Sequence, residues 1–360
     1  MLKRFIAAPV AALAIAGLAL GGLTATPADA KDKFRVGYTI YVGFMPYGWM
    51  ADNGILKKWA DKYGIEIEVI QTADYVGGIN QFVARDLDAV AVASMDGLTI
   101  PAAGGVDTTI ALAGDFSNGN DGMVSKTAKS VKELKGETIH LFELTVSHYL
   151  LSRALEKEGM SLRDVKTVNI TDADIGPAYI GTDEVKHAVT WNPILLEIED
   201  QVKASTRLFD SEQTPEEIVD VMLFHTDTIE KDPRFVKAFV GAWYETMEIM
   251  SGGDERAESM IADLADASGG SVESYKAQLA STHMYYKPED AIALMESDGH
   301  KQTWDFVRQF SFDVGLFGEN ATSADFIGIE FPDGTILGDE NNVKLRINST
   351  FTHMAAEGKL

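Results

Sequence analysis

The segments that could form a ligand site carry acidic side chains and no basic ones. Six segments that follow a predicted strand or begin a predicted helix are 39–53, 94–109, 113–125, 142–152, 169–185 and 189–193. Their 77 residues include ten Asp or Glu but no Lys or Arg, whereas about seven basic residues would be expected at the average of residues 31–360. A desolvated site for sulfonate, sulfate or nitrate needs cationic or helix N-terminal donors. The pattern therefore favours a small cation over a small anion.

Of guanidine and urea, the two solutes implied by the family resemblance given below, guanidinium matches these side chains better. It is planar, offers N–H groups in forks that fit carboxylates in bidentate fashion, and stacks on an aromatic face for roughly 0.5–2 kcal/mol. Urea has a similar shape without the charge, and it prefers amide and carbonyl partners to a buried carboxylate. We therefore expect an acidic and aromatic guanidinium site, with urea as the alternative.

Glu143 and Asp96 are the first candidates for ligand carboxylates. Glu143 follows the predicted strand 138–142 and precedes a predicted helix start at Ser147, where a parallel sheet places its ligands. It could equally support the helix N-terminus electrostatically. Asp96 follows the predicted strand 89–93, and there it could bind a ligand or cap a helix.

Four further aspartates have both a ligand and a turn interpretation. Asp115 and Asp121 flank a Gly- and Asn-rich segment at the predicted hinge, where Asx side chains also form turns. Asp172 and Asp174 belong to an Asp-Ala-Asp sequence that reaches the site or stays in a solvated loop. Of these four, Asp115, Asp172 and Asp174 are predicted ligand residues.

Aromatic side chains supply the predicted walls of the site. Trp191 follows a short apolar strand, so its indole lies either at the cleft or in the core beneath the loop. Several aromatic residues crowd positions 41–49 at spacings that cannot all face a core. Tyr41 and Tyr47 are therefore predicted to line the pocket.

The elements that position these side chains alternate between strand and helix in the first part of the chain. Strands are predicted at 34–40, 65–70, 89–93 and 108–113, with helices at about 49–63 and 76–84. The stretch 114–122 interrupts this rhythm because it is rich in Gly and Asn. It is predicted to be the first crossing between two lobes.

A second α/β unit follows, and a helical segment completes the chain. The unit has predicted strands at 138–142, 165–170 and 188–190 and a helix at about 147–157. An apolar strand near 222–225 precedes helices predicted at 232–250, 254–267, 272–280, 288–296 and 301–310. We predict that residues 31–117 and 224–360 form lobe 1 and that residues 118–223 form lobe 2.

Residues 1–30 have the pattern of a cleaved signal peptide. Lys3 and Arg4 precede an apolar run at 5–20, and a small-x-small cleavage site ends at Ala30. A periplasmic location is therefore expected. The chain has no cysteine, and its formal net charge of −24 disfavours nucleic acid and anionic membranes as partners.

The phrases at 94–107, 114–121, 146–151 and 189–193 resemble the solute-binding proteins encoded beside urea carboxylase. This subgroup is associated with guanidine use and lies within the taurine, nitrate and thiamine-pyrimidine type of binding proteins. The resemblance implies a type II-like periplasmic binding protein fold, with two α/β lobes, a hinge and an interlobe cleft. It also implies a monomer that delivers guanidine or urea to the permease subunits of an ABC importer, without catalysis and without a cofactor.

The resemblance also implicates the start of the helix at Ser147. In anion-binding relatives this helix N-terminus holds the anion. Here Glu143 is expected to occupy that positive end instead, which would convert an anion site into a cation site. Ser147 and His148 are therefore included among the predicted ligand residues.

Other functions remain as alternatives. A related pyrimidine-synthase-like enzyme would use histidines, and His140 and His148 form the one close pair in a candidate segment. The sequence shows no Gly-x-Ser-x-Gly elbow and no His-Glu metal spacing, so neither catalysis nor a metal is expected. Among binding proteins, urea and a sulfonate, nitrate or thiamine-pyrimidine type of solute stay open.

Overall fold

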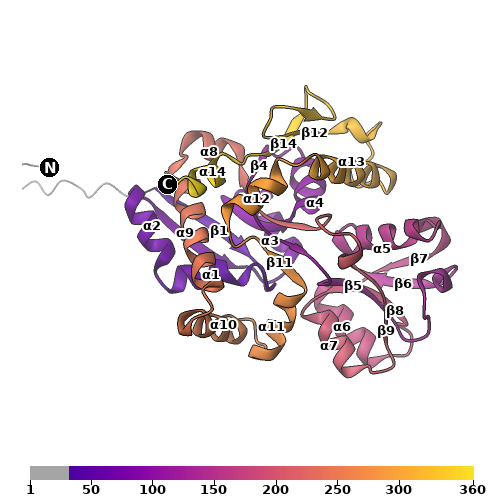
Figure 1. Cartoon of the computed structure of the whole chain (residues 1–360). Coiled ribbons are helices and arrows are strands. Elements are labelled where there is room, and N and C mark those ends of the chain that lie inside the picture. The colour runs from indigo at the N-terminus through magenta and orange to yellow at the C-terminus, as the bar shows by residue number, and fades with distance from the viewer. Residues whose placement is uncertain (1–31) are drawn as a thin grey trace, which may run out of the picture. The chain divides into compact units, whose positions relative to one another are not determined.

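Two β-sheets organise residues 32–360, which are the part of the chain that the computed structural model describes (Figure 1). Sheet A has nine strands in the order β13-β12-β14-β4-β10-β3-β1-β2, and β11 pairs with β4. Its strands are β1 (Lys33–Tyr38), β2 (Glu66–Gln71), β3 (Ala89–Ala93), β4 (Thr108–Ser117), β10 (Val219–His225), β11 (Thr282–Met284), β12 (Gly328–Glu330), β13 (Ile336–Leu337) and β14 (Val343–Ile347). The predicted signal peptide, 1–30, lies outside the described residues.

Sheet B has five strands in the order β7-β6-β8-β5-β9. They are β5 (Asp121–Ser125), β6 (Thr138–Leu141), β7 (Lys166–Asn169), β8 (His187–Trp191) and β9 (Thr206–Asp210). Figure 1 shows helix α5 on one side of this sheet and α6 and α7 on the other. Strands β3, β4 and β10 of sheet A and β5 of sheet B are buried along their whole length, which accounts for the apolar sequence of β3 and the mostly apolar sequence of β10.

Fourteen α-helices connect and cover the sheets in residues 32–360. They are α1 (Met45–Asp52), α2 (Ile55–Tyr63), α3 (Tyr75–Val83), α4 (Ser94–Gly97), α5 (Val146–Lys157), α6 (Asp172–Gly181), α7 (Ile194–Gln201), α8 (Thr226–Lys231), α9 (Arg234–Ser251), α10 (Glu255–Ala267), α11 (Val272–Ala280), α12 (Pro288–Met295), α13 (Asp298–Asp313) and α14 (Thr350–Ala356). None of the described helices is long and apolar enough to span a membrane.

One predicted helix is in fact two. The helix expected at 49–63 is divided into α1 and α2, because Gly54 adopts a φ of 74° between them. This left-handed conformation is readily available to glycine and ends the first helix.

The chain passes between the sheets twice. It leaves sheet A after β4 and returns at β10, which pairs antiparallel with both β3 and β4. Residues 219–225 therefore belong to sheet A by strand pairing. The lobe boundaries at 117/118 and 223/224 stay predictions, because residues 32–360 form one compact unit.

The segment before β10 is tied to helix α5. Arg153 donates from Nε and Nη2 to the two carboxylate oxygens of Glu217, at 2.8 and 3.0 Å. The Tyr149 hydroxyl donates to the same carboxylate at 2.8 Å. A bidentate pair of this kind fixes direction as well as distance, so it orients α5 relative to the return crossing.

Aromatic side chains of α1 and α9 pack together in the core next to sheet A. Phe239 is fully buried, and its ring centroid lies 5.5 Å from Tyr47 and 6.0 Å from Phe224. Tyr47 also packs against Trp243 at 4.7 Å. These rings hold α1 against the helical segment that follows β10.

Replacing Phe239 with alanine should lower the free energy of unfolding by about 3–5 kcal/mol, because a cavity replaces a fully buried ring. Urea denaturation followed by circular dichroism would measure the change. Val272→Ala is the control, since Val272 is 40% exposed, and its effect should stay within about 0.5 kcal/mol. Equal effects of the two substitutions would contradict this packing.

Candidate functional site

A small pocket lies between elements of both sheets. Its volume is about 40 Å³. A buried water needs about 10–15 Å³, so the pocket has room for roughly three waters or one ligand of comparable size. It is lined by Thr39, Ile40, Tyr41, Phe44, Tyr75, Ala93, Asp121, Val146, Asp172, Trp191, Ile218 and Asp220. In the described part of the chain, no Lys or Arg side chain is among the lining residues.

Strand pairing explains why these residues meet. Ala93 ends β3 and pairs with Asp220, which lies near the start of the antiparallel strand β10. In sheet B, Asp121 begins β5 and pairs with Trp191, which ends β8. The carboxyl ends of β3 and β8 and the amino ends of β10 and β5 therefore face one pocket, as expected for ligand sites in α/β folds.

Asp220 and Asp115 form a buried carboxyl pair at the sheet A side of the pocket. They are partners across β4 and β10, and their side chains are in contact. Both residues are buried, and the Tyr41 hydroxyl donates to Asp115 Oδ1 at 3.3 Å. Asn120 Nδ2 in turn donates to the Tyr41 oxygen at 3.2 Å. Tyr41 therefore joins the carboxyl pair to the pocket wall.

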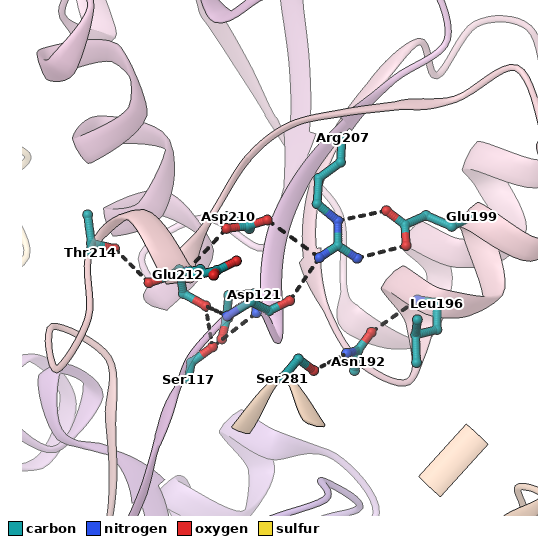
Figure 2. Close-up of polar contacts among 12 residues, drawn as sticks. Ser117, Asp121, Asn192, Leu196, Glu199, Arg207, Asp210, Glu212, Thr214 and Ser281 are labelled. Atoms are coloured by element: carbon teal, nitrogen blue, oxygen red, sulfur yellow. Dashed lines mark hydrogen bonds and ion pairs between the residues drawn. The ribbon is translucent and has the colours of Figure 1, made fainter. Parts of the chain in front are cut away.

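Asp121 is positioned by a hydrogen-bond network at the crossing between the sheets (Figure 2). Its N–H donates to Ser117 Oγ at 3.0 Å, and Ser117 Oγ lies 2.7 Å from Ser211 Oγ. Because the two serines belong to β4 and to the segment after β9, both crossings hold this residue in place. Asp121 itself is buried.

Arg207 is close to this network, but its charge is already paired. Its Nε and Nη2 donate to the carboxylate of Glu199, both at 2.7 Å, and its Nη1 lies 3.6 Å from Asp210 Oδ2. Nη1 also donates to the carbonyl of Gly119 at 3.0 Å. The guanidinium thus braces the crossing and does not line the pocket.

Asp96 lies behind Tyr75, which lines the pocket. The Tyr75 hydroxyl donates to Asp96 Oδ2 at 2.8 Å and accepts from the Ala93 N–H at 2.9 Å. Asp96 is fully buried, and its other oxygen, Oδ1, makes no hydrogen bond to the described residues. A buried acceptor without a donor is costly when it is ionised.

Burial raises the pKa of all four of these aspartates. Burial raises the pKa of Asp96 and of Asp115 to about 7 and that of Asp121 to about 6. The pKa of Asp220 is also raised well above its ordinary value, by burial first and then by the charges of Asp115 and Asp121. Hydrogen bonds from neutral groups such as the Tyr75 and Tyr41 hydroxyls offset these shifts only in part, and no basic side chain in residues 32–360 contributes to them.

Aromatic rings form the remaining walls. The ring centroids of Tyr75 and Trp191 lie 6.1 Å apart in an edge-to-face arrangement, and those of Tyr41 and Phe44 lie 4.8 Å apart. Trp191 is half-buried, so part of its ring is exposed at the pocket. These faces are suited to stacking on a flat or cationic ligand.

The predicted site residues fall into three groups. Tyr41, Asp172 and Trp191 line the pocket, and burial raises the pKa of Asp172. Asp96 and Asp115 lie directly behind lining residues. The remaining predicted residues are outside the pocket lining: Tyr47, Glu143, Ser147, His148 and Asp174.

Three residues in the last group, Tyr47, Glu143 and His148, make local contacts outside the pocket. Tyr47 is in the core next to Trp243. The Glu143 N–H donates to Asn169, and His148 Nδ1 accepts from the Leu144 N–H at 3.3 Å. Asp174 is exposed. Helix α5 begins at Val146 with Thr145 as its N-cap, so Ser147 lies within its first turn, where its buried Oγ has no hydrogen-bond partner among the described residues.

Four lining residues with polar groups are not among the predicted ligand residues: Thr39, Tyr75, Asp121 and Asp220. Asp121 has both a ligand and a turn interpretation in the sequence, whereas no sequence pattern considered above singles out Thr39, Tyr75 or Asp220. Asp220 had a readable signal, because it is a lone acidic residue in the apolar strand Val219–His225. No group of three or more potential metal ligands occurs in the described residues, so the pocket carboxylates are not arranged as a metal centre.

Comparison with known proteins identifies the fold and then the family. The alkanesulfonate-binding protein SsuA from Xanthomonas axonopodis pv. citri aligns with 82% of this chain and 98% of its own, at 17% identity and a TM-score of 0.63. The nitrate-binding protein NrtA from Synechocystis PCC 6803 aligns with 87% and 97%, at 15% identity and a TM-score of 0.55. The predicted α/β periplasmic binding protein fold is therefore confirmed.

The chain belongs to the NMT1/THI5-like family, whose model matches residues 56–257. The taurine-binding periplasmic protein of Escherichia coli K12 is 31% identical over 131 residues. That match covers 36% of this chain and 40% of the relative's length.

Asp96→Asn should stabilise the ligand-free protein more at pH 8 than at pH 5. The pKa of Asp96 is about 7 in the folded protein and 3.8 ordinarily. The stability that the protonated Asp96 contributes is therefore fully present below pH 3.8 and is lost as the pH rises through about 7. The difference in unfolding free energy between variant and native protein should grow by about 2–3 kcal/mol from pH 5 to pH 8, as measured by urea denaturation.

Asp164→Asn provides a control of opposite sign. Hydrogen bonds from Ser161 and Lys135 lower the pKa of this exposed residue, so its stabilisation is lost only in acid, below its ordinary pKa of 3.8. Its variant should be destabilised by the same amount at pH 5 and pH 8. A pH-independent effect of Asp96→Asn as well would show that Asp96 is not a strained carboxylate.

Proposed function

We propose that this protein is the periplasmic solute-binding component of an ABC importer and that its ligand is guanidinium. The observation that carries the proposal is the charge of the pocket. Asp121 and Asp220 line it from different sheets, Asp96 and Asp115 lie behind the lining residues Tyr75 and Tyr41, and no Lys or Arg of the described residues lines it. Buried carboxylates of this kind call for a cationic partner.

The family and the fold support a binding role rather than catalysis. The named relatives bind taurine, alkanesulfonates or nitrate, and two sheets joined by two crossings can close around a ligand by hinge motion. Their role in import is carried over here, together with a periplasmic location and membrane permease subunits as partners. Their ligands are not carried over, because the pocket offers an anion no cationic side chain.

The geometry suits a planar cation with several N–H donors. Asp121 and Asp220 approach the pocket from sheet B and sheet A, so a guanidinium between them would donate to both carboxylates. Trp191 and Tyr75 offer ring faces for stacking, and the volume of about 40 Å³ restricts the ligand to a few non-hydrogen atoms. The similarity to proteins encoded beside urea carboxylase is consistent with this ligand.

Urea is the second candidate, and one observation favours it. Because burial raises the pKa of Asp96 and Asp115 to about 7 and that of Asp121 to about 6, some pocket carboxyl groups carry a proton near neutral pH. A protonated carboxyl group can donate to the carbonyl oxygen of urea. The protonation state of these carboxyl groups therefore decides between the two ligands, because ionised groups favour guanidinium and protonated groups favour urea.

Calorimetric titration of the ligand-free protein, residues 31–360, tests the ligand class directly. Guanidinium should bind at micromolar concentration or better at neutral pH, urea should bind at least tenfold more weakly, and taurine should give no binding heat. Heat from taurine alone would contradict the proposal, and tighter binding of urea than of guanidinium would select the second candidate.

Asp121→Asn should weaken guanidinium binding by about 100-fold or more, because a buried ion pair loses one partner. Urea binding should change less, since urea carries no charge. Glu143→Gln is the matched control, because it too replaces one carboxylate by an amide. Glu143 lies just before the start of α5 and outside the pocket lining. A larger loss with Glu143→Gln than with Asp121→Asn would restore Glu143 as the ligand carboxylate.

A further inference from the structure

The Asp115 and Asp220 pair lacks the donors that two ionised carboxylates need. The two residues are cross-strand partners, they are 0% and 5% exposed, and their carboxyl groups are in contact. Asp115 Oδ2 accepts no hydrogen bond from an N–H or hydroxyl group of the described residues. Two carboxylates at such close range cannot both be ionised at moderate cost without a cation.

The groups that face the pair are acidic or neutral on every side. Tyr41 contacts it from the loop after β1, and Asp121 acts on it from β5. The charge of Asp115 contributes to raising the pKa of four tyrosines. They are Tyr47 in α1, Tyr275 in α11, and Tyr285 and Tyr286 in the segment after β11. Among the described residues, no Lys, Arg or His contributes to the titration of either aspartate.

The shortage of donors has a simple remedy in the empty protein. One proton bound between the two carboxyl groups supplies the missing hydrogen bond and removes one of the two charges. A guanidinium ion in the adjacent pocket would meet the pair through Asp220, which lines the pocket, and would bring a positive charge and several N–H donors to that side. The proton and the ligand therefore satisfy the same need.

We propose that Asp115 and Asp220 share one proton when the pocket is empty and that binding of guanidinium expels this proton to solvent. The inference rests on the proposed function, since it requires a cationic ligand. The exchange is balanced: the carboxyl group loses a proton to the buffer, both carboxylates become negative, and the ligand keeps its own protons. Guanidinium remains charged throughout, as the arginine side chain does.

The exchange makes recognition depend on pH. Expulsion of one proton per ligand predicts that guanidinium affinity rises about tenfold per pH unit while the pair is still protonated, and levels off above that range. Urea needs no charge and binds without expelling the proton, so its affinity should not rise with pH. The ratio of guanidinium to urea affinity should therefore increase from pH 5 to pH 8.

Calorimetry in buffers of different ionisation enthalpy measures the released proton on the native protein. At about pH 6 the apparent binding enthalpy of guanidinium should vary with buffer by a slope close to one proton released per ligand. Guanidinium binding with no buffer dependence would overturn the inference and leave the proposed function intact. Absence of guanidinium binding at every pH would reject both.

Two variants assign the proton to the pair. Asp220→Asn keeps a donor toward Asp115 but cannot lose it as a proton, so proton release should fall to less than half and the affinity should become nearly independent of pH. Glu143→Gln removes a carboxyl group outside the pocket lining, and release should persist. Persistent release in Asp220→Asn, or its loss in Glu143→Gln alone, would contradict the assignment to Asp115 and Asp220.

Discussion

The burial of four carboxyl groups without a cation is the constraint on which the site depends. Asp96, Asp115, Asp121 and Asp220 are all buried, and an ionised carboxylate in such a setting costs several kcal/mol unless it is paired. Packing of the aromatic core stabilises the fold and offsets this cost, and the hydrogen-bond network at the sheet crossings holds Asp121 in place. A site that is strained when empty is one that a cation would relieve on binding.

The pocket carboxylates belong to both sheets, so a ligand that binds them would hold the two sheets together. Asp220 belongs to sheet A and Asp121 to sheet B, and both flank the points where the chain passes between the sheets. A ligand bound by both residues would link the sheets directly. Arg207 and Arg153, each held by a bidentate carboxylate, stabilise the crossings and leave the pocket itself without positive charge.

Much of the framework could be predicted from the sequence, but only part of the site. Apolar runs located strands such as β3 and β4, and the missing Lys and Arg indicated an acidic site that includes Tyr41, Asp172 and Trp191. The sequence favours Glu143 because this residue follows a parallel strand. In the structure, the amino end of the antiparallel strand β10 lies at the pocket and places Asp220 in its lining. Strand direction depends on long-range pairing, which local patterns do not encode.

The central claim is that the pocket carboxylates hold a planar cation between the two sheets. A crystal structure of the protein with guanidinium tests this claim most directly. The account predicts the ion between Asp121 and Asp220, with N–H groups at about 2.7–2.9 Å from carboxylate oxygens and an aromatic face of Trp191 or Tyr75 against it. An ion bound at Glu143 and the start of α5, or a pocket that takes up an anion instead, would contradict it.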